Sequence, residues 1–287
     1  MPDNPRMGSY EYYERLYEVE ERHWWSRGIR DVAARILNAH YRGMRGLNIL
    51  DAGCGTGITL SWLEQNDLPK RVIGLDLSWY AFEFCWKRGT HLLCQSSVLE
   101  LPFKSDSFDL VVCNDVIQHL PGKEGDQIAL REFYRVLKLG GCLFVRTNSN
   151  WGMGNQRSAD DDYKRYSLDQ LRHKVRQSGF RMLKATHANI LLSVIPTIKR
   201  YLKQRKEYLY YKQGFPINLL PPHLEWLNTL LYWVMKGEAW FLSKPSITSP
   251  FGHTIFFSTK TGAWLSGTVA INTKKLDLKR TDGSNVW

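Results

Sequence analysis

The stretch Leu47-Asn-Ile-Leu-Asp51-Ala-Gly53-Cys54-Gly55-Thr-Gly57 joins an apolar run to an acidic residue and three alternating glycines. The apolar run predicts a buried strand, and glycines at its end permit a tight turn and close approach of the backbone to a ligand. Residues 58–63 predict a helix whose first amides face that ligand. The segment is therefore expected to hold a nucleotide-like cofactor.

A second apolar run, Arg71-Val-Ile-Gly-Leu-Asp76, ends in a carboxylate about 20 residues after the loop, where it can accept hydrogen bonds from both hydroxyls of a ribose. The spacing Gly-x-Gly-x-Gly differs from the dinucleotide pattern Gly-x-Gly-x-x-Gly. Asp51 would repel a pyrophosphate but attract an ammonium group. S-adenosylmethionine has an ammonium group and no phosphate, so it is the preferred ligand, and another nucleotide is the alternative.

Several short motifs together resemble those of class I S-adenosylmethionine-dependent methyltransferases. They are Asp51 to Gly57, Asp76, Leu101-Pro-Phe103, Ser107-Phe-Asp109 and Gln118-His119-Leu120. This resemblance covers roughly residues 45 to 150. Three further motifs resemble those of a methyltransferase type 11-like bacterial subgroup, the His-Trp-Trp subgroup. They are His23-Trp24-Trp25, Arg165-Tyr166-Ser167 and Pro250-Phe-Gly-His-Thr254. The family implies S-adenosyl-L-methionine as cofactor and methyl transfer as activity.

Strand-like and helical segments alternate along the chain, which predicts an α/β fold. The strands are expected at residues 48–52, 72–76, 92–95, 110–114, 142–147, 180–188 and 252–260. This alternation favours a doubly wound, mostly parallel sheet with its cofactor crevice at the carboxyl ends of the strands. The family resemblance implies a Rossmann-like, seven-stranded sheet whose last two strands form an antiparallel edge.

The chain is expected to divide into five segments. They are an N-terminal helical cover (1–44), the Rossmann-like core (45–188), a basic and aromatic helical insertion (189–250), the final core strand (251–262) and a tail (263–287). Within the cover, Tyr12, Leu16, Val19 and His23 recur at helical spacing, and Ser26 is a candidate N-cap of a second helix.

Charge is distributed unevenly. Residues 1–160 contain 19 Lys/Arg and 20 Asp/Glu, whereas residues 161–287 contain 20 and 8, so the formal net charge of +11 is the sum of −1 and +12. The basic half suits an anionic substrate, an acidic membrane surface or nucleic acid, and a solvated face is the alternative. No leader-like or membrane-spanning run is found, so we expect a cytoplasmic protein. The five cysteines have no metal-ligand spacing and are expected to be reduced core residues.

The insertion combines bases with aromatic residues. Lys199-Arg-Tyr-Leu-Lys-Gln-Arg-Lys-Glu-Tyr-Leu-Tyr-Tyr-Lys212 is followed by Trp226, Trp233 and Trp240 at helical separations. One interpretation is a lid over an acceptor that also makes peripheral contact with membrane headgroups, because Trp, Tyr and Lys suit that boundary. The alternative is an ordinary pair of packing helices.

The resemblance implies roles for individual residues at the cofactor. The backbone at Gly53, Cys54, Gly55 and Gly57 would lie beside the methionine part and the ribose. Asp51 would bind the ammonium group and Asp76 the ribose hydroxyls. Leu77, Ser97 and Asn114 are the remaining cofactor candidates. Leu77 can pack on adenine, and Ser97 stands where the family commonly has an aspartate.

Asp115 and His119 follow the fourth strand, where the methyl group would meet its acceptor, and they are the catalytic candidates. His119 can accept a proton at neutral pH or, alternatively, only order the loop. The acceptor is expected to be a small, partly apolar or anionic molecule. Nucleic acid is disfavoured as the acceptor, because Asn114-Asp115-Val116-Ile117 lacks the Pro-Pro-aromatic block found in methyltransferases that act on the amino groups of nucleic acids. A non-catalytic protein that binds the cofactor or a membrane, and an RNA methyltransferase, are the alternatives.

Overall fold

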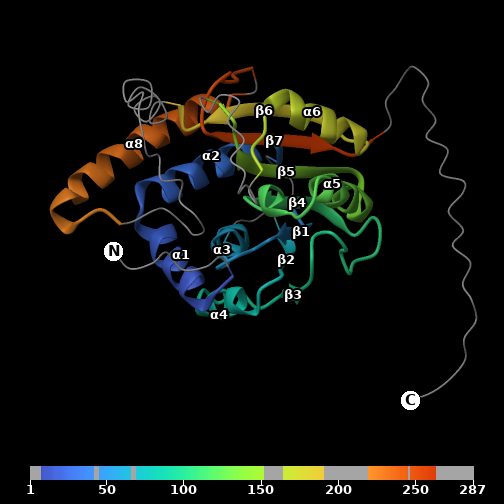
Figure 1. Ribbon diagram of the computed structural model, residues 1–287, viewed down its shortest axis with the longest axis horizontal. Coiled ribbons are helices and arrows are strands. Elements are labelled where there is room, and N and C mark those ends of the chain that lie inside the picture. Colours follow the sequence, from blue (N-terminus) through green and yellow to red (C-terminus); the bar gives the residue numbers. More distant parts are fainter. Residues whose placement is uncertain are drawn as a thin grey trace, which may run out of the picture.

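The computed structural model describes residues 8–41, 45–65, 69–151, 164–190, 219–244 and 246–262. A seven-stranded sheet lies between two layers of helices (Figure 1). Its strands are β1 (Leu47–Ala52), β2 (Pro69–Asp76), β3 (Leu93–Gln95), β4 (Phe108–Asn114), β5 (Leu137–Asn148), β6 (Arg181–Ala188) and β7 (Thr254–Lys260). The helices are α1 (Tyr10–Arg22), α2 (Trp24–Tyr41), α3 (Ile58–Glu64), α4 (Trp79–Lys87), α5 (Gly125–Val136), α6 (Leu168–Gln177) and α8 (Glu225–Leu242), with short turns η1 (Ile117–His119) and η2 (Pro222–Leu224).

The strand order across the sheet is β3-β2-β1-β4-β5-β7-β6. Strands β1 to β5 pair in parallel, whereas β7 pairs antiparallel with both β5 and β6. The predicted α/β, mostly parallel fold is confirmed, and each predicted strand overlaps an observed one. Because the chain order reverses between β1 and β4, the ends of these two strands border the crevice that such sheets use for ligands.

Each face of the sheet has its own hydrophobic core. Alternation along the strands sends Ile49 and Phe144 to one face and Leu50 and Leu143 to the other. The first core includes α1 to α4 and α8, and the second includes α5 and α6. The N-terminal helices therefore share one core with the sheet and with α8.

The predicted helical pair at the N-terminus is present, but the expected N-cap is wrong. Ser26 lies buried inside α2, which begins two residues earlier at Trp24. The amide of Trp24 donates a hydrogen bond of 2.9 Å to Oδ1 of Asn228 in α8. A side chain from a distant helix thus replaces the local cap, which sequence spacing alone does not indicate.

Helix α8 contains the predicted tryptophans of the insertion and packs along α2 (Figure 1). The basic and aromatic run at 199–212 and the tail at 263–287 lie outside the described residues. None of the helices within the described ranges combines the length and the apolar character needed to cross a bilayer.

Candidate functional site

The loop between β1 and α3 has a backbone shape that suits glycine. The φ angles of Gly53, Gly55 and Gly57 are 87°, 53° and 81°. A Cβ atom on Gly53 would lie 2.1 Å from a methyl of Val116, and one on Gly57 would lie 2.9 Å from the Cys85 sulfur. A Cβ atom on Gly55 would meet nothing within 4 Å. Packing therefore requires glycine at the first and third positions, while the middle one leaves open space beside the loop.

The Asp76 carboxylate, at the end of β2, lies against this loop. Its Oδ2 accepts a hydrogen bond of 2.9 Å from the Gly55 amide, and its Oδ1 accepts one of 2.9 Å from the Ser78 amide. The Tyr13 hydroxyl in α1 donates to Oδ1 at 3.4 Å. Burial raises the pKa of Asp76, and these donors partly oppose that shift. The loop and the carboxylate predicted for the ribose are therefore in direct contact.

Two polar side chains near the ends of neighbouring strands each have a buried oxygen that the described residues leave unpartnered. They are Asp51 in β1, through Oδ2, and Asn114 in β4, through Oδ1. Burial raises the pKa of Asp51 to about 8, and the nearby Asp76 charge adds to the rise. Unpartnered buried acceptors are costly in a folded protein. A ligand that brings a positively charged donor to Asp51 would relieve that cost.

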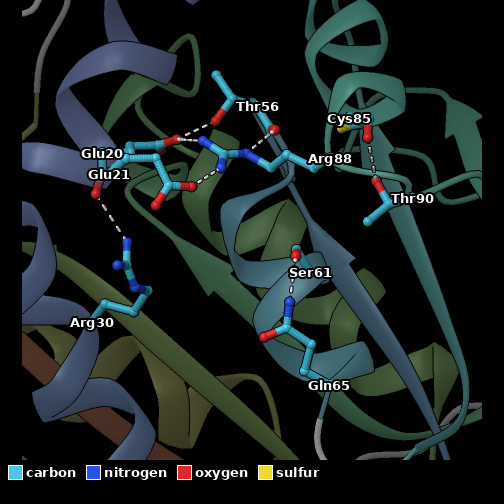
Figure 2. A network of polar contacts seen from close by, with 9 residues as sticks. All are labelled: Glu20, Glu21, Arg30, Thr56, Ser61, Gln65, Cys85, Arg88 and Thr90. Carbon is cyan, nitrogen blue, oxygen red and sulfur yellow. Dashed lines mark hydrogen bonds and ion pairs between the residues drawn. The ribbon is translucent and has the colours of Figure 1, made fainter.

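Arg88, which directly follows α4, links α1 to the loop between β1 and α3 (Figure 2). The buried guanidinium forms an ion pair of 3.3 Å with Glu20 and another with Glu21. It also donates a hydrogen bond of 2.9 Å to the Thr56 carbonyl oxygen, and the Thr56 hydroxyl donates to Glu20. Burial raises the pKa of Glu20, whereas Thr56 and Arg88 oppose the shift. The network joins α1 to the loop between β1 and α3 and to the end of α4.

The segment after β4 contains both catalytic candidates. Asp115 has a left-handed φ of 57°, which is uncommon for a residue with a side chain. Its Oδ2 accepts hydrogen bonds of 2.9 and 2.5 Å from Nε and Nη2 of Arg146 in β5. Burial lowers the pKa of His119, and the Asp115 charge opposes the shift. His119 is therefore neutral at pH 7 and able to accept a proton, whereas Asp115 is held by a guanidinium.

The remaining predicted residues lie at the rim or beneath the loop. Leu77 is 71% exposed beside Asp76. The Ser97 hydroxyl accepts a hydrogen bond of 3.1 Å from the Leu99 amide in the turn after β3. The Cys54 sulfur is buried 4.0 Å from that of Cys85, so its side chain packs between the loop and α4. A role for Cys54 at a ligand would therefore involve its backbone, and the individual cofactor and catalytic roles stay predictions.

Sequence reasoning missed four polar residues that border the site: Tyr13 and Glu20 in α1, Arg88 after α4, and Arg146 in β5. Tyr13 and Glu20 lie on the amphipathic helix α1. The hydrophobic pattern of this helix predicts that one face is buried, but it does not predict which strand ends that face covers. Arg146 had a weak signal, because it interrupts an apolar strand near its carboxyl end.

Comparison with known proteins identifies a domain in the middle of the chain. Residues 50–145 match the family model of a methyltransferase domain. The chain is 32% identical over 143 residues to the demethylmenaquinone methyltransferase of Lactiplantibacillus plantarum, covering 46% of this chain and 55% of that protein. It is 29% identical over 141 residues to the malonyl-[acyl-carrier protein] O-methyltransferase of Legionella pneumophila, covering 47% and 45%. The chain thus spans about half the length of these curated relatives.

The fold is similar to that of a Haloferax volcanii methyltransferase solved with the Trm112 methyltransferase activator. The TM-score is 0.58 at 17% identity, covering 90% of this chain and 99% of that one. At this identity the likeness concerns the fold alone. The His-Trp-Trp subgroup stays a prediction. Residues 50–145 thus form a methyltransferase domain, and the seven-stranded sheet that contains it has the class I S-adenosylmethionine-dependent methyltransferase fold, whose cofactor is S-adenosylmethionine.

Proposed function

We propose that this protein transfers the methyl group of S-adenosylmethionine to a small, partly apolar or anionic acceptor. The observation that carries the proposal is the pair of carboxylates, the buried Asp51 and the half-buried Asp76, on neighbouring parallel strands beside the glycine loop. Among the described residues, Asp51 has an unpartnered oxygen, and Asp76 accepts a hydrogen bond from the Gly55 amide, beside a glycine whose Cβ position is open. This pair fits a ligand with an ammonium group at one end and a ribose diol at the other.

Different residues of the site would bind different parts of the cofactor. Asp51 would bind the ammonium group through its unpartnered oxygen, and Asp76 would accept hydrogen bonds from the ribose. The Tyr13 hydroxyl already donates to that carboxylate, so α1 would cover the ribose side. When bound, the cofactor supplies a methyl group on a sulfonium, which is already activated for displacement.

The protein's part in such a displacement is to align the acceptor, exclude water and remove a proton where the acceptor carries one. His119 suits the last task because burial keeps its imidazole neutral. The ion pair between Asp115 and Arg146 would hold the segment after β4 in place beside it. Two curated relatives are named for demethylmenaquinone and malonyl-[acyl-carrier protein], so these are the first acceptors to test.

Titration calorimetry with S-adenosylmethionine and S-adenosylhomocysteine would test the cofactor, and transfer of a radioactive methyl group into each acceptor would test the activity. Binding of both cofactor forms together with labelled product supports the proposal. Binding without transfer to these acceptors or to any component of a small-molecule extract would favour a non-catalytic cofactor-binding protein. Label that enters only RNA would identify a different acceptor class.

A further inference from the structure

The outer face of α8 presents large aromatic side chains to solvent. Trp226, Trp233 and Trp240 are 64%, 58% and 55% exposed. They recur every seven residues, so they line one side of the helix, and Leu230 and Phe241 extend the same exposed stripe. Single exposed apolar residues are ordinary, but a continuous aromatic stripe indicates an interaction surface.

Two lysines border this stripe, and both contact its aromatic rings. The Lys236 ammonium lies 4.6 Å from the centre of a Trp233 ring, and that of Lys244 lies 4.1 Å from the centre of a Trp240 ring. The one acidic residue between Trp226 and Lys244 is Glu238. It is buried on the opposite side, where its carboxylate accepts hydrogen bonds from backbone amides. The exposed side of this stretch therefore combines apolar rings with positive charge.

The opposite side of α8 is anchored at both ends. Near the start, Asn228 accepts a hydrogen bond from the Trp24 amide and donates one of 3.0 Å to the Arg22 carbonyl oxygen. At the end, the buried Lys184 ammonium donates to the carbonyl oxygens of Leu242, Lys244 and Ile247 at 2.7, 2.8 and 3.0 Å. These contacts fix which side of α8 faces outward, so the tryptophans are held at the surface.

We propose that this outer face docks on an anionic lipid bilayer. Tryptophan and lysine together suit the headgroup region, because the ring inserts at the edge of the acyl chains while the ammonium group meets lipid phosphate. The +12 net charge of residues 161–287 provides the long-range attraction that an acidic membrane requires. A second protein copy fits less well, because like-charged faces would meet in a symmetric dimer.

Flotation of the full-length protein with vesicles tests the proposal. Wild type is expected to float with phosphatidylcholine–phosphatidylglycerol vesicles and to do so less with phosphatidylcholine alone. The triple variant Trp226→Gln, Trp233→Gln, Trp240→Gln should partition about tenfold more weakly. The pair Lys236→Gln, Lys244→Gln should lose the preference for anionic vesicles.

The exposed tryptophans of α4 provide a matched control. Trp79 and Trp86 are 54% and 42% exposed, and the variant Trp79→Gln, Trp86→Gln should float as wild type does. Equal flotation of the triple variant, or loss only in the α4 control, would overturn the proposal. The proposal would also be overturned if light scattering showed that the wild-type protein is a dimer and the triple variant is a monomer. Flotation needs no cofactor. Calorimetry of S-adenosylmethionine binding to the same variants therefore tests the methyl-transfer proposal separately from membrane docking.

Discussion

The hydroxyl of Tyr13 donates a hydrogen bond of 3.4 Å to Oδ1 of Asp76 and so joins the N-terminal helix to the end of β2. The same carboxylate receives the amides of Gly55 and Ser78. Burial raises the pKa of the Tyr13 hydroxyl, which therefore stays protonated and remains a donor. A ribose bound at Asp76, as we propose, would meet a carboxylate that is already oriented from three segments of the chain, which would lower the entropy lost on binding.

Replacing Asp76 should weaken cofactor binding with little change in shape. In Asp76→Asn the negative charge and one acceptor are lost, so we expect affinity for S-adenosylhomocysteine to fall about 10- to 100-fold, or about 1 to 3 kcal/mol, by calorimetry. Tyr13→Phe keeps the carboxylate and serves as the control, with a change below about threefold. An unaltered affinity in Asp76→Asn would remove this residue from the site.

Cofactor binding should release a proton from Asp51. In the free protein burial raises the pKa of this carboxyl to about 8, so it is largely protonated at pH 7. An ammonium group favours the charged form and lowers that pKa, hence affinity should rise as the pH increases from 6 toward about 8. Binding enthalpies in phosphate and Tris at pH 7 report the released proton. Asp51→Asn should abolish the release, and equal release from both proteins would contradict the assignment.

His119→Asn tests proton removal separately from binding. If the imidazole takes a proton from an oxygen or nitrogen acceptor, turnover should fall about 100-fold or more while calorimetric affinity for the cofactor stays the same. Asn keeps a polar side chain in the half-buried loop. Full activity in this variant would show that alignment of the acceptor suffices.

Stability should fall in mild acid because of His23. Burial lowers the pKa of His23 from 6.5 to about 4. Its Nδ1 accepts a hydrogen bond of 3.2 Å from the Trp25 amide, which requires the neutral ring. Between pH 6.5 and 4 the unfolded chain binds the proton that the folded one excludes, so this contribution is complete above pH 6.5. The free energy of unfolding should drop by about 2 kcal/mol from pH 7 to pH 5 through this group.

Urea titrations at both pH values measure that drop, and His23→Gln provides the comparison. The variant should lack the part of the pH dependence due to histidine while keeping the part due to carboxylates. An identical slope in wild type and variant would show that another group is responsible.

Lys184→Met should destabilise the protein by about 2 kcal/mol in urea unfolding, because three carbonyl oxygens at and just after the end of α8 lose their donor. Burial lowers the pKa of Lys184, but its three acceptors remain satisfied only while the ammonium is present. Lys244→Met is the matched surface control, with an expected change below about 0.5 kcal/mol. Equal effects of the two substitutions would rule out the internal contacts as the cause.

The sequence was informative where function and local structure depend on neighbouring residues. Asp51 and Asp76 end apolar runs, so both strand ends and their meeting at one edge of the sheet could be predicted from alternation and spacing alone. Gly179 likewise marks the end of α6 through its left-handed φ of 90°. In each case a few adjacent residues determine the outcome.

What sequence reasoning could not supply were contacts between distant segments. The start of α2 depends on Asn228, which follows Trp24 by 204 positions. The contact between Arg146 and Asp115 depends on the pairing of β4 with β5. It also depends on the left-handed backbone of Asp115, which the sequence does not predict. Such partners are chosen by tertiary packing, which overrides local propensity.

The two anchors of α8 also limit how the protein can be shortened. A fragment that stops at Ala188 would lack Asn228 and the carbonyl groups that receive Lys184, so it would expose a buried ammonium and an uncapped α2. It would also lack β7, which separates β5 from β6 in the sheet. Trimming the protein after residue 188 would therefore produce an aggregation-prone fragment rather than a minimal catalyst.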